Sequence, residues 1–449
     1  MQVIYEVPNT NGSSSPYLGT GLIEDVDGGF FGVSSRGGSH FNSGSQGDGM
    51  IFKAAKTGAF TNLFSFSATN GCFPYGGLTR GSDGNLYGMT VHGGTNFISF
   101  SVGNDGTIFR FSTNGAFRSL LSFKGTNGSM PYGRLEFGPD GYLYGGTYAG
   151  GAFGVGTLFK VSTNGTMIWS FSFDGTNGHS PALGASWKLT RGTDDCLYGT
   201  TRYGSTNLTG PYYTGNGILF KITTNGVFTP LLYFGGTNGR MPCSGLSQIG
   251  NGDLWGTTLA GGEYGFGTIF RFTTNGTLIT VASFDGTAGV DPRGGVVQGS
   301  DNSFYGTTSY SYATLTNGTI YKVTTNGELT TLVYLNGTNG LHPDTDLMLA
   351  SDGNLYGAMD DITLSAAPNA GNIFRLIAPP VLSATPTTTN LLLSWTSFSN
   401  GAYRVDYTPS LAAPNWNTLK SNVTASGSTA VCSDNAGNTE RYYRVVLLP

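Results

Sequence analysis

The chain carries little charge for its size. Only 11% of its 449 residues are Asp, Glu, Lys or Arg, whereas about 25% is usual for a soluble domain. The 22 basic and 26 acidic residues leave a formal net charge of -4. Because nucleic-acid binding calls for an excess of clustered Lys and Arg, this balance argues against a nucleic-acid partner.

Long hydrophobic runs are also missing. The longest apolar stretches, such as residues 391–393 and 445–448, are far shorter than the roughly 20 residues that span a bilayer. The first five residues carry no charged segment of the kind that begins a signal peptide. We therefore expect no membrane insertion and interpret the chain as a mature form.

Cysteine is scarce. Four cysteines are too few for a disulfide framework in a chain of this length, so we expect free thiols. The sequence contains no CxxC or HExxH motif, which removes support for attached haem, structural zinc and zinc-protease chemistry. We expect no cofactor and no metal.

Glycine, by contrast, is abundant. The chain has 73 glycines, more than twice the usual share of roughly 7%. With 38% hydrophobic and 13% aromatic residues it can still bury large cores, which excludes a disordered chain. The composition therefore predicts a folded protein that is rich in turns.

Internal repetition dominates the sequence. A Thr-Asn-Gly tripeptide or a close variant, followed by a proline, recurs at intervals of 50 to 61 residues. The seven copies begin at Thr10, Thr69, Thr126, Thr176, Thr237, Thr287 and Thr338. Each copy continues with an aromatic-glycine pair, such as Tyr87 and Gly88, and an apolar-aromatic-basic triplet, such as Ile108, Phe109 and Arg110.

Each copy predicts four short antiparallel strands. In the second copy we expect them at residues 77–80, 85–90, 107–112 and 117–123. Asp83 with Gly84 and Asn114 with Gly115 supply the tight hairpin turns between them. Four strands per repeat of about 50 residues indicate an all-β chain and, over seven copies, a seven-bladed β-propeller.

The two ends of the repeat predict how the ring closes. The seventh copy stops after its third strand, at residues 372–376, while the chain begins with a strand at residues 2–7. That first strand occupies the place where every other copy has its fourth strand. We expect it to complete the last blade and to leave no open sheet edge, so that the propeller spans residues 1–377.

The repeat is absent from residues 378–449. Alternating runs around Trp395, Tyr403 and Tyr443 are typical of a small β-sandwich. This C-terminal segment resembles a shortened fibronectin type III module.

The repeat unit resembles that of the GloVer-containing proteins. The resemblance rests on Gly-Ser-Asp-Gly-Asn-Leu-Tyr-Gly at residues 81–88, a Gly-Gly pair at 93–94, Gly-Thr-Ile-Phe-Arg at 106–110 and Leu-Leu-Ser-Phe at 120–123. More distantly, the unit is similar to the Asp-Gly-Asn-Leu-Trp repeats of periplasmic two-component sensor propellers. The resemblance covers residues 1–377 and implies a secreted or surface-attached bacterial protein. It supplies no catalytic residues.

Residues common to all seven copies are most simply explained by the blade itself. By this rule the basic residues of the triplets are structural and link neighbouring blades, and departures from the repeat are the candidates for function. Three positions after the repeat proline, Gly77, Gly245 and Gly295 give way to Arg134 and Asp346.

Further departures lie next to the repeat prolines. The residues directly after the proline diverge and include Tyr75, Tyr132, Arg293 and Asp344; His179 and His342 lie just before it, and extra residues in the fourth copy bring in Trp187. Because charge is scarce, we expect Arg134, Arg293, Asp344 and Asp346 to gather at one mouth of the central channel, as a ligand site or as a structural ion-pair cluster.

The loops between the second and third strands should emerge on the same face. They vary in length and carry aromatic residues, among them Tyr212 and Tyr213. Variable loops on a rigid scaffold often bind ligands, and exposed aromatic rings suit sugar rings. Packing of these aromatics within their own loops is the alternative.

Three functions fit these patterns. The first is a noncatalytic binding or adhesion protein that recognises a polysaccharide or another surface polymer. The second is a polysaccharide lyase, in which Tyr75, Tyr132, His179 and His342 would exchange protons while arginine neutralises a uronate carboxylate. A glycosidase is less well supported, because its two facing carboxylates would have to come from one copy. The third is a subunit of a surface layer or filament.

Overall fold

The computed structural model describes residues 1–6, 18, 21–40, 47–95, 105–181, 184–204, 215–310, 318–336, 340–359, 371–377, 382–387, 390–397, 402–411, 415–426, 429–435 and 440–448. The regular structure in these ranges is β-strand. None of the described residues forms a helix long and apolar enough to cross a bilayer.

The chain divides into two compact units. The larger comprises Met1–Gln298, Ser303–Met348 and Tyr356–Arg375, and the smaller comprises Gly299–Asn302, Leu349–Leu355 and Leu376–Pro449.

The repeats form four-stranded antiparallel sheets, seven of them within the described ranges. The strands of six sheets follow chain order: β2 (Ile23–Glu24), β3 (Phe30–Ser34), β4 (Met50–Ala54) and β5 (Phe60–Ser65); β6 (Thr79–Arg80), β7 (Leu86–Thr90), β8 (Thr107–Phe111) and β9 (Phe117–Ser122); β10 (Glu136–Phe137), β11 (Leu143–Thr147), β12 (Thr157–Val161) and β13 (Met167–Ser172); β14 (Thr190–Arg191), β15 (Leu197–Thr201), β16 (Ile218–Ile222) and β17 (Phe228–Tyr233); β18 (Ser247–Gln248), β19 (Leu254–Thr258), β20 (Thr268–Phe272) and β21 (Leu278–Ser283); β22 (Val297–Gln298), β23 (Phe304–Thr308), β24 (Thr319–Val323) and β25 (Leu329–Tyr334).

The seventh sheet joins the two ends of the repeat region. Its strands are, in order, β1 (Gln2–Glu6), β28 (Asn372–Leu376), β27 (Leu355–Met359) and β26 (Met348–Leu349). The pairing of β1 with β28 is antiparallel, with Gln2 opposite Arg375. Arg375 Nη2 also donates a hydrogen bond of 2.6 Å to Gln2 Oε1. The first strand of the chain thus lies where the sequence predicts it.

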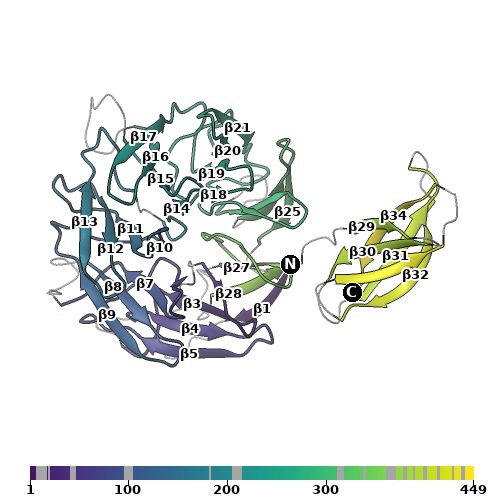
Figure 1. Ribbon diagram of the computed structural model, residues 1–449, viewed down its shortest axis with the longest axis horizontal. Coiled ribbons are helices and arrows are strands. Elements are labelled where there is room, and N and C mark those ends of the chain that lie inside the picture. Colours follow the sequence, from purple (N-terminus) through teal and green to yellow (C-terminus); the bar gives the residue numbers. More distant parts are fainter. Residues whose placement is uncertain are drawn as a thin grey trace. The chain divides into compact units, whose positions relative to one another are not determined.

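The sheets of the larger unit follow one another around a common centre in a propeller-like arrangement (Figure 1). The short strands β10, β14 and β18 lie near that centre, while β9, β13, β17 and β21 lie on the outside. Hydrophobic cores form between successive sheets; one contains Tyr144 and Leu158 of the third copy with Leu189 and Phe220 of the fourth.

The aromatic-glycine pair and the triplet are explained by strand pairing. In the third copy Gly145 on β11 lies directly opposite Phe159 on β12. A Cβ atom on Gly145 would come within 2.6 Å of the Phe159 ring, and Phe159 is fully buried. The glycine of the pair therefore leaves space for the aromatic ring of the triplet.

The basic residue of the triplet pairs chiefly within its own copy. Lys160 Nζ lies 2.7 Å from Asp140 Oδ2, and the Tyr144 hydroxyl donates to the same oxygen at 2.7 Å. Lys160 also donates to the Thr224 carbonyl of the next copy at 3.0 Å. The predicted link to a neighbouring copy is thus present at Lys160, and the same residue also pairs with the carboxylate of the turn in its own copy.

The smaller unit contains two three-stranded antiparallel sheets among its described residues. The first has the order β29 (Leu382–Pro386), β30 (Leu391–Thr396) and β33 (Thr429–Asp434); the second has the order β32 (Asn417–Thr424), β31 (Ala402–Thr408) and β34 (Tyr442–Leu447). Leu393 and Trp395 of the first sheet pack with Tyr403 and Val405 of the second.

Candidate functional site

The residue before the repeat proline has a left-handed backbone. The φ angles are 56° at Phe73, 56° at Met130, 51° at Ser180, 59° at Met241, 55° at Asp291 and 42° at His342. Residues other than glycine rarely adopt this conformation. Hydrogen bonds hold it: the Met241 N–H donates to the Asn216 carbonyl at 2.7 Å, and the Met241 carbonyl accepts from the Leu259 N–H at 3.2 Å. These hydrogen bonds thereby fix the backbone directly before the repeat proline.

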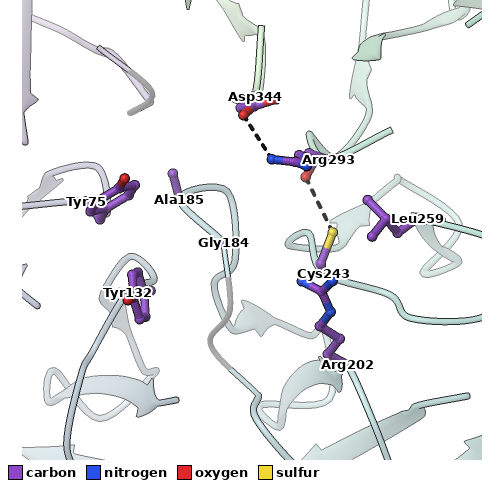
Figure 2. Close-up of a pocket in the computed structure, with 9 residues that line it drawn as sticks. All are labelled: Tyr75, Tyr132, Gly184, Ala185, Arg202, Cys243, Leu259, Arg293 and Asp344. Atoms are coloured by element: carbon purple, nitrogen blue, oxygen red, sulfur yellow. Dashed lines mark hydrogen bonds and ion pairs between the residues drawn. The ribbon is translucent and has the colours of Figure 1, made fainter. Parts of the chain in front are cut away.

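A pocket of about 260 Å³ lies beside several of the repeat prolines. Its lining residues are Tyr75, Tyr132, Gly184, Ala185, Arg202, Cys243, Leu259, Arg293 and Asp344. In Figure 2 the two tyrosines lie on one side of Gly184 and Ala185, and the cysteine and both arginines lie on the other. The pocket therefore has an aromatic end and a charged end.

Two positions of the repeat build most of this lining. Tyr75, Tyr132, Cys243, Arg293 and Asp344 each follow directly after a repeat proline, two positions after the left-handed residue. The second position is the residue that follows the second strand of a copy, as Arg202 follows β15 and Leu259 follows β19. The sequence analysis identified four of the lining residues but missed Arg202, which could have been found by comparing this second position across the copies.

The charged end contains an ion pair. Arg293 Nη1 lies 3.2 Å from Asp344 Oδ2, and the Ser309 hydroxyl donates to Asp344 Oδ1. The Cys243 thiol donates to the Arg293 carbonyl at 4.0 Å. Both carboxylate oxygens of Asp344 thus have a partner. The side chain of Arg293 is held by its ion pair with Asp344.

The aromatic end consists of tyrosines in edge-to-face contact. The Tyr75 and Tyr132 rings meet edge to face with centroids 5.5 Å apart, and Tyr132 meets Tyr148 in the same way at 5.9 Å. Burial and the two neighbouring tyrosines raise the pKa of Tyr132 to about 12. At neutral pH its hydroxyl is therefore protonated and can donate a hydrogen bond.

Arg202 and Asp291 extend the charged end. Arg202 stacks on Tyr203, with its guanidinium carbon 5.5 Å from the ring centroid. Burial raises the pKa of Asp291, and Asp344 adds to the rise, although both arginines oppose it. Burial raises the pKa of the Cys243 thiol to about 11. The thiol is accordingly neutral between the two guanidinium groups.

A second charged group lies just before the innermost strands. Arg134, Lys188 and Asp346 each stand two residues before such a strand and directly before a buried leucine, where other copies have Gly21, Gly77, Gly245 and Gly295. Asp346 Oδ1 accepts from the Gly295 N–H at 2.6 Å, and Arg134 Nε donates to Thr79 Oγ1 at 3.1 Å. The sequence analysis missed Lys188, because the extra residues of the fourth copy displace it from the proline.

These inner carboxyl groups are strongly desolvated. Burial raises the pKa of Asp346, against the opposing attraction of Lys188 and Arg134. Burial likewise raises the pKa of Glu136, whose nearby cations are Lys188, Arg134 and Arg191. Arg134 and Asp346 are not among the residues that line the pocket. Arg293 and Asp344 therefore form an ion pair in the pocket, while Arg134 and Asp346 belong to a charged group just before the innermost strands.

Trp187 lies in the core, not in the pocket. Its side chain is fully buried, and its Nε1 donates to the Thr200 carbonyl at 2.9 Å. A Cβ atom on Gly133 would come within 2.7 Å of the Trp187 ring, and one on Gly146 within 2.8 Å. Two glycines of the preceding copy thus leave space for it, and we correct its predicted binding role to one in packing.

Neither histidine lines the pocket. His179 is only 4% exposed; it shares a hydrogen bond of 2.5 Å with the Ser180 hydroxyl, and burial lowers its pKa. His342 Nδ1 donates to the Ser309 carbonyl at 3.0 Å, and its ring lies 4.6 Å from that of Tyr310. Tyr212 and Tyr213 lie outside the described residues.

A metal site would need several ligands close together. Among the described residues no group of three or more His, Cys, Asp or Glu side chains is arranged to hold a metal ion.

Comparison with known protein families identifies the same repeat region. The family described as the Gloeobacter/Verrucomicrobia repeat matches residues 20–248 and 203–430. A search of curated proteins found no match. One similar solved structure is the extracellular domain of a protein assigned as a hybrid two-component system of B. thetaiotaomicron, with 12% identity and a TM-score of 0.48; the match covers 99% of this chain and 55% of that chain.

Two further solved structures are similar. A protein assigned as a 6-phosphogluconolactonase of Bacteroides uniformis has 14% identity and a TM-score of 0.46, over 90% of this chain and 98% of that chain. An α-L-arabinofuranosidase of Fusarium graminearum, solved with arabinobiose, has 10% identity and a TM-score of 0.41, over 84% of this chain and 97% of that chain.

Proposed function

The chain belongs to the Gloeobacter/Verrucomicrobia repeat family, and from that premise we propose that it is a noncatalytic protein that binds a polysaccharide or another surface polymer through the pocket. We also propose that the seven sheets form a closed seven-bladed β-propeller and that residues 378–449 form a fibronectin type III-like module. The site of action that we propose is the exterior of a bacterial cell, as the family resemblance implies.

The observation that carries the proposal is the pairing of an aromatic end with a charged end in one pocket (Figure 2). Tyr75 and Tyr132 offer ring faces and hydroxyl groups, which suit a sugar that has both C–H faces and hydroxyls. Arg293 and Asp344 offer a donor and an acceptor held in fixed orientation. Mostly apolar pockets with a few oriented polar groups are the usual form of small-molecule sites.

The size of the pocket favours one sugar unit. A volume of about 260 Å³ is below the roughly 300–1,000 Å³ common for drug-sized ligands. We therefore propose that the pocket takes a terminal or projecting unit of a polymer, while the rest of the polymer runs over the surrounding loops.

A lyase is less well supported than a binding protein. A lyase needs a group that removes a proton near neutral pH. The pKa of Tyr132 is raised to about 12, and the lining of the pocket includes neither His179 nor His342. A binding role requires no such group.

A glycan array with the full chain tests the proposal, followed by titration calorimetry on each bound glycan. Tyr132→Ala and Arg293→Ala should each weaken binding about tenfold or more, corresponding to about 1.4 kcal/mol. Tyr233→Ala, on the outer strand β17, is the matched control and should leave affinity unchanged.

Three results would contradict the proposal. The first is an array with no bound glycan, which would favour a role in assembly. The second is unchanged affinity in both pocket variants. The third is ultraviolet absorbance from unsaturated sugar ends after incubation with the bound polymer, which would identify a lyase.

A further inference from the structure

One guanidinium nitrogen of the pocket, Arg202 Nε, lacks a hydrogen-bonding partner among the described residues. Arg202 follows β15, and its backbone N–H donates to the Ser180 carbonyl at 3.4 Å. Its Nε is buried and makes no hydrogen bond to any described residue, although the side chain lines the pocket. A buried charged donor without a partner is unfavourable unless a ligand or ordered water supplies an acceptor.

The nearby carboxylates do not fill this role. Asp344 Oδ2 is paired with Arg293 Nη1 at 3.2 Å, and its Oδ1 accepts from Ser309. Asp291 lies near enough to Arg202 to feel its charge, but within the described ranges the two make no ion pair at 4.0 Å or less. The charge of Arg202 is therefore available to a ligand.

The thiol beside the arginines does not compete with an anionic ligand. Cys243 donates to the Arg293 carbonyl, and burial raises its pKa to about 11. The thiol is consequently neutral near pH 7. Leu259 completes this end of the pocket with an apolar surface, which limits the water that would otherwise solvate the guanidinium.

We infer, on the basis of the proposed function, that the pocket selects an acidic sugar unit and that Arg202 binds its carboxylate. The planar guanidinium offers its two terminal nitrogens as paired donors, and this geometry matches the two oxygens of a carboxylate. Tyr75 and Tyr132 at the other end contact the sugar ring. The ligand class is thus a uronate-containing polysaccharide.

Calorimetric titration of the full chain tests the inference. The probes are short oligogalacturonides, oligoglucuronides and oligomannuronates, each with its fully methyl-esterified counterpart. For at least one of the three, the acid form should bind about tenfold more tightly than its ester, and its affinity should fall with added salt because the contact is between charges. The affinity of the ester should change little with salt.

Variants of Arg202 test whether this residue causes the preference for the acid form over the ester. Arg202→Gln should abolish the difference between acid and ester, and Arg202→Lys should restore part of it, since lysine keeps the charge but loses the planar fork. Arg118→Gln, on the outer strand β9, is the matched control and should keep the full preference. Thermal unfolding of each variant checks its fold; if Arg202→Gln unfolds, Arg202→Lys and the salt dependence decide.

The outcomes separate the inference from the proposed function. Equal affinity for acids and esters, or an acid preference that survives in Arg202→Gln, overturns the inference while leaving carbohydrate binding intact if Tyr132→Ala still weakens it. Tighter binding of sulfated than of uronate glycans also overturns it. Failure of every glycan to bind overturns both.

Discussion

The turns of the sheets and the pocket use the same residue types in opposite ways. In the turn of the third copy, Asp140 accepts from Tyr144 and pairs with Lys160, both at 2.7 Å. In the pocket, Arg202 has a buried Nε without a partner among the described residues. Arg271 of a triplet also has a buried Nε without a hydrogen bond among the described residues, but this nitrogen lies 3.8 Å from Asp253 Oδ2 of its own copy. What distinguishes Arg202 is that its side chain lines the pocket.

Deletion of residues 1–6 should have the largest effect on the repeat region. It removes β1 and leaves β28 as an unpaired edge. We expect the melting temperature to fall by roughly 10 °C or more, because a whole strand is lost from one sheet. Differential scanning calorimetry measures the change. Gln2→Ala, which removes only the side-chain bond to Arg375, is the control; a truncated chain that melts like this control would contradict ring closure by β1.

Asp140→Ala should have the next largest effect. It leaves the buried Tyr144 hydroxyl and the nearly buried Lys160 without their carboxylate, at a cost of about 1–3 kcal/mol in the free energy of unfolding. Urea titration measures this loss, and glycan affinity should stay unchanged because Asp140 does not line the pocket. Arg191→Ala removes an exposed ion pair with Asp195 and one of three cations near Glu136, and should cost less than about 1 kcal/mol. Equal losses of unfolding free energy in the two variants would contradict the prediction that the carboxylate of the turn contributes more than the exposed ion pair.

A pH titration should distinguish carboxylates with satisfied partners from desolvated ones. In the smaller unit, burial raises the pKa of Asp406, but hydrogen bonds from Arg404, Arg444 and Thr418 outweigh it and hold the pKa below its usual value. The stability that ionised Asp406 gives to the fold is fully present above its unfolded pKa of about 3.9. It is lost as the pH falls through the lower pKa of the folded state.

The raised pKa of Asp346 gives the opposite sign: its charged form is disfavoured in the fold, so its contribution to stability is lost as pH rises through the raised pKa.

Hydrogen exchange of the full chain, corrected for intrinsic rates, measures both effects. Peptides from β31 should lose protection below about pH 4, and Asp406→Asn should flatten that dependence. An unchanged acid response of β31 in Asp406→Asn would contradict the role assigned to its two arginines.

Arg134→Gly should have the smallest effect. Glycine occupies the equivalent position as Gly21, Gly77, Gly245 and Gly295. The substitution removes one bond to Thr79 and a cation near Asp346 and Glu136, but it also removes a guanidinium whose charged form burial disfavours, since burial lowers the pKa of Arg134. We expect a change below about 1 kcal/mol in the free energy of unfolding and no change in glycan affinity, since Arg134 does not line the pocket. A marked loss of glycan affinity would mean that the charged group of Arg134, Lys188 and Asp346 takes part in binding.

Much of the fold could be predicted from local signals. The strands of the second copy, β6 to β9, lie within one residue of the predicted ranges, apart from the first, which begins two residues later. Hairpin residues such as Asp83 and Gly84 set the turns, and the spacing of the copies sets the sheets. The antiparallel partner of β1 could likewise be predicted by counting strands in the last copy.

The candidate site could be predicted only in part. Tyr75, Tyr132, Arg293 and Asp344 were found because the residue after the proline has the same place in every copy. Arg202 was missed because a residue at the end of a strand looks like any loop residue until its neighbours from other copies are known. Lys188 was missed because inserted residues break the count from the proline.

The sequence by itself determined the repeat, its four strands and the pairing of its ends, because turn chemistry and strand alternation act over a few residues. Tertiary structure decided which departures face a ligand. Trp187 is buried because Gly133 and Gly146 of the preceding copy leave room for its ring, whereas Arg202 lines a pocket because the residues across from it are Cys243 and Arg293. Side chains from different copies meet only after the sheets have packed, so the choice between core and pocket depends on contacts that no single copy contains.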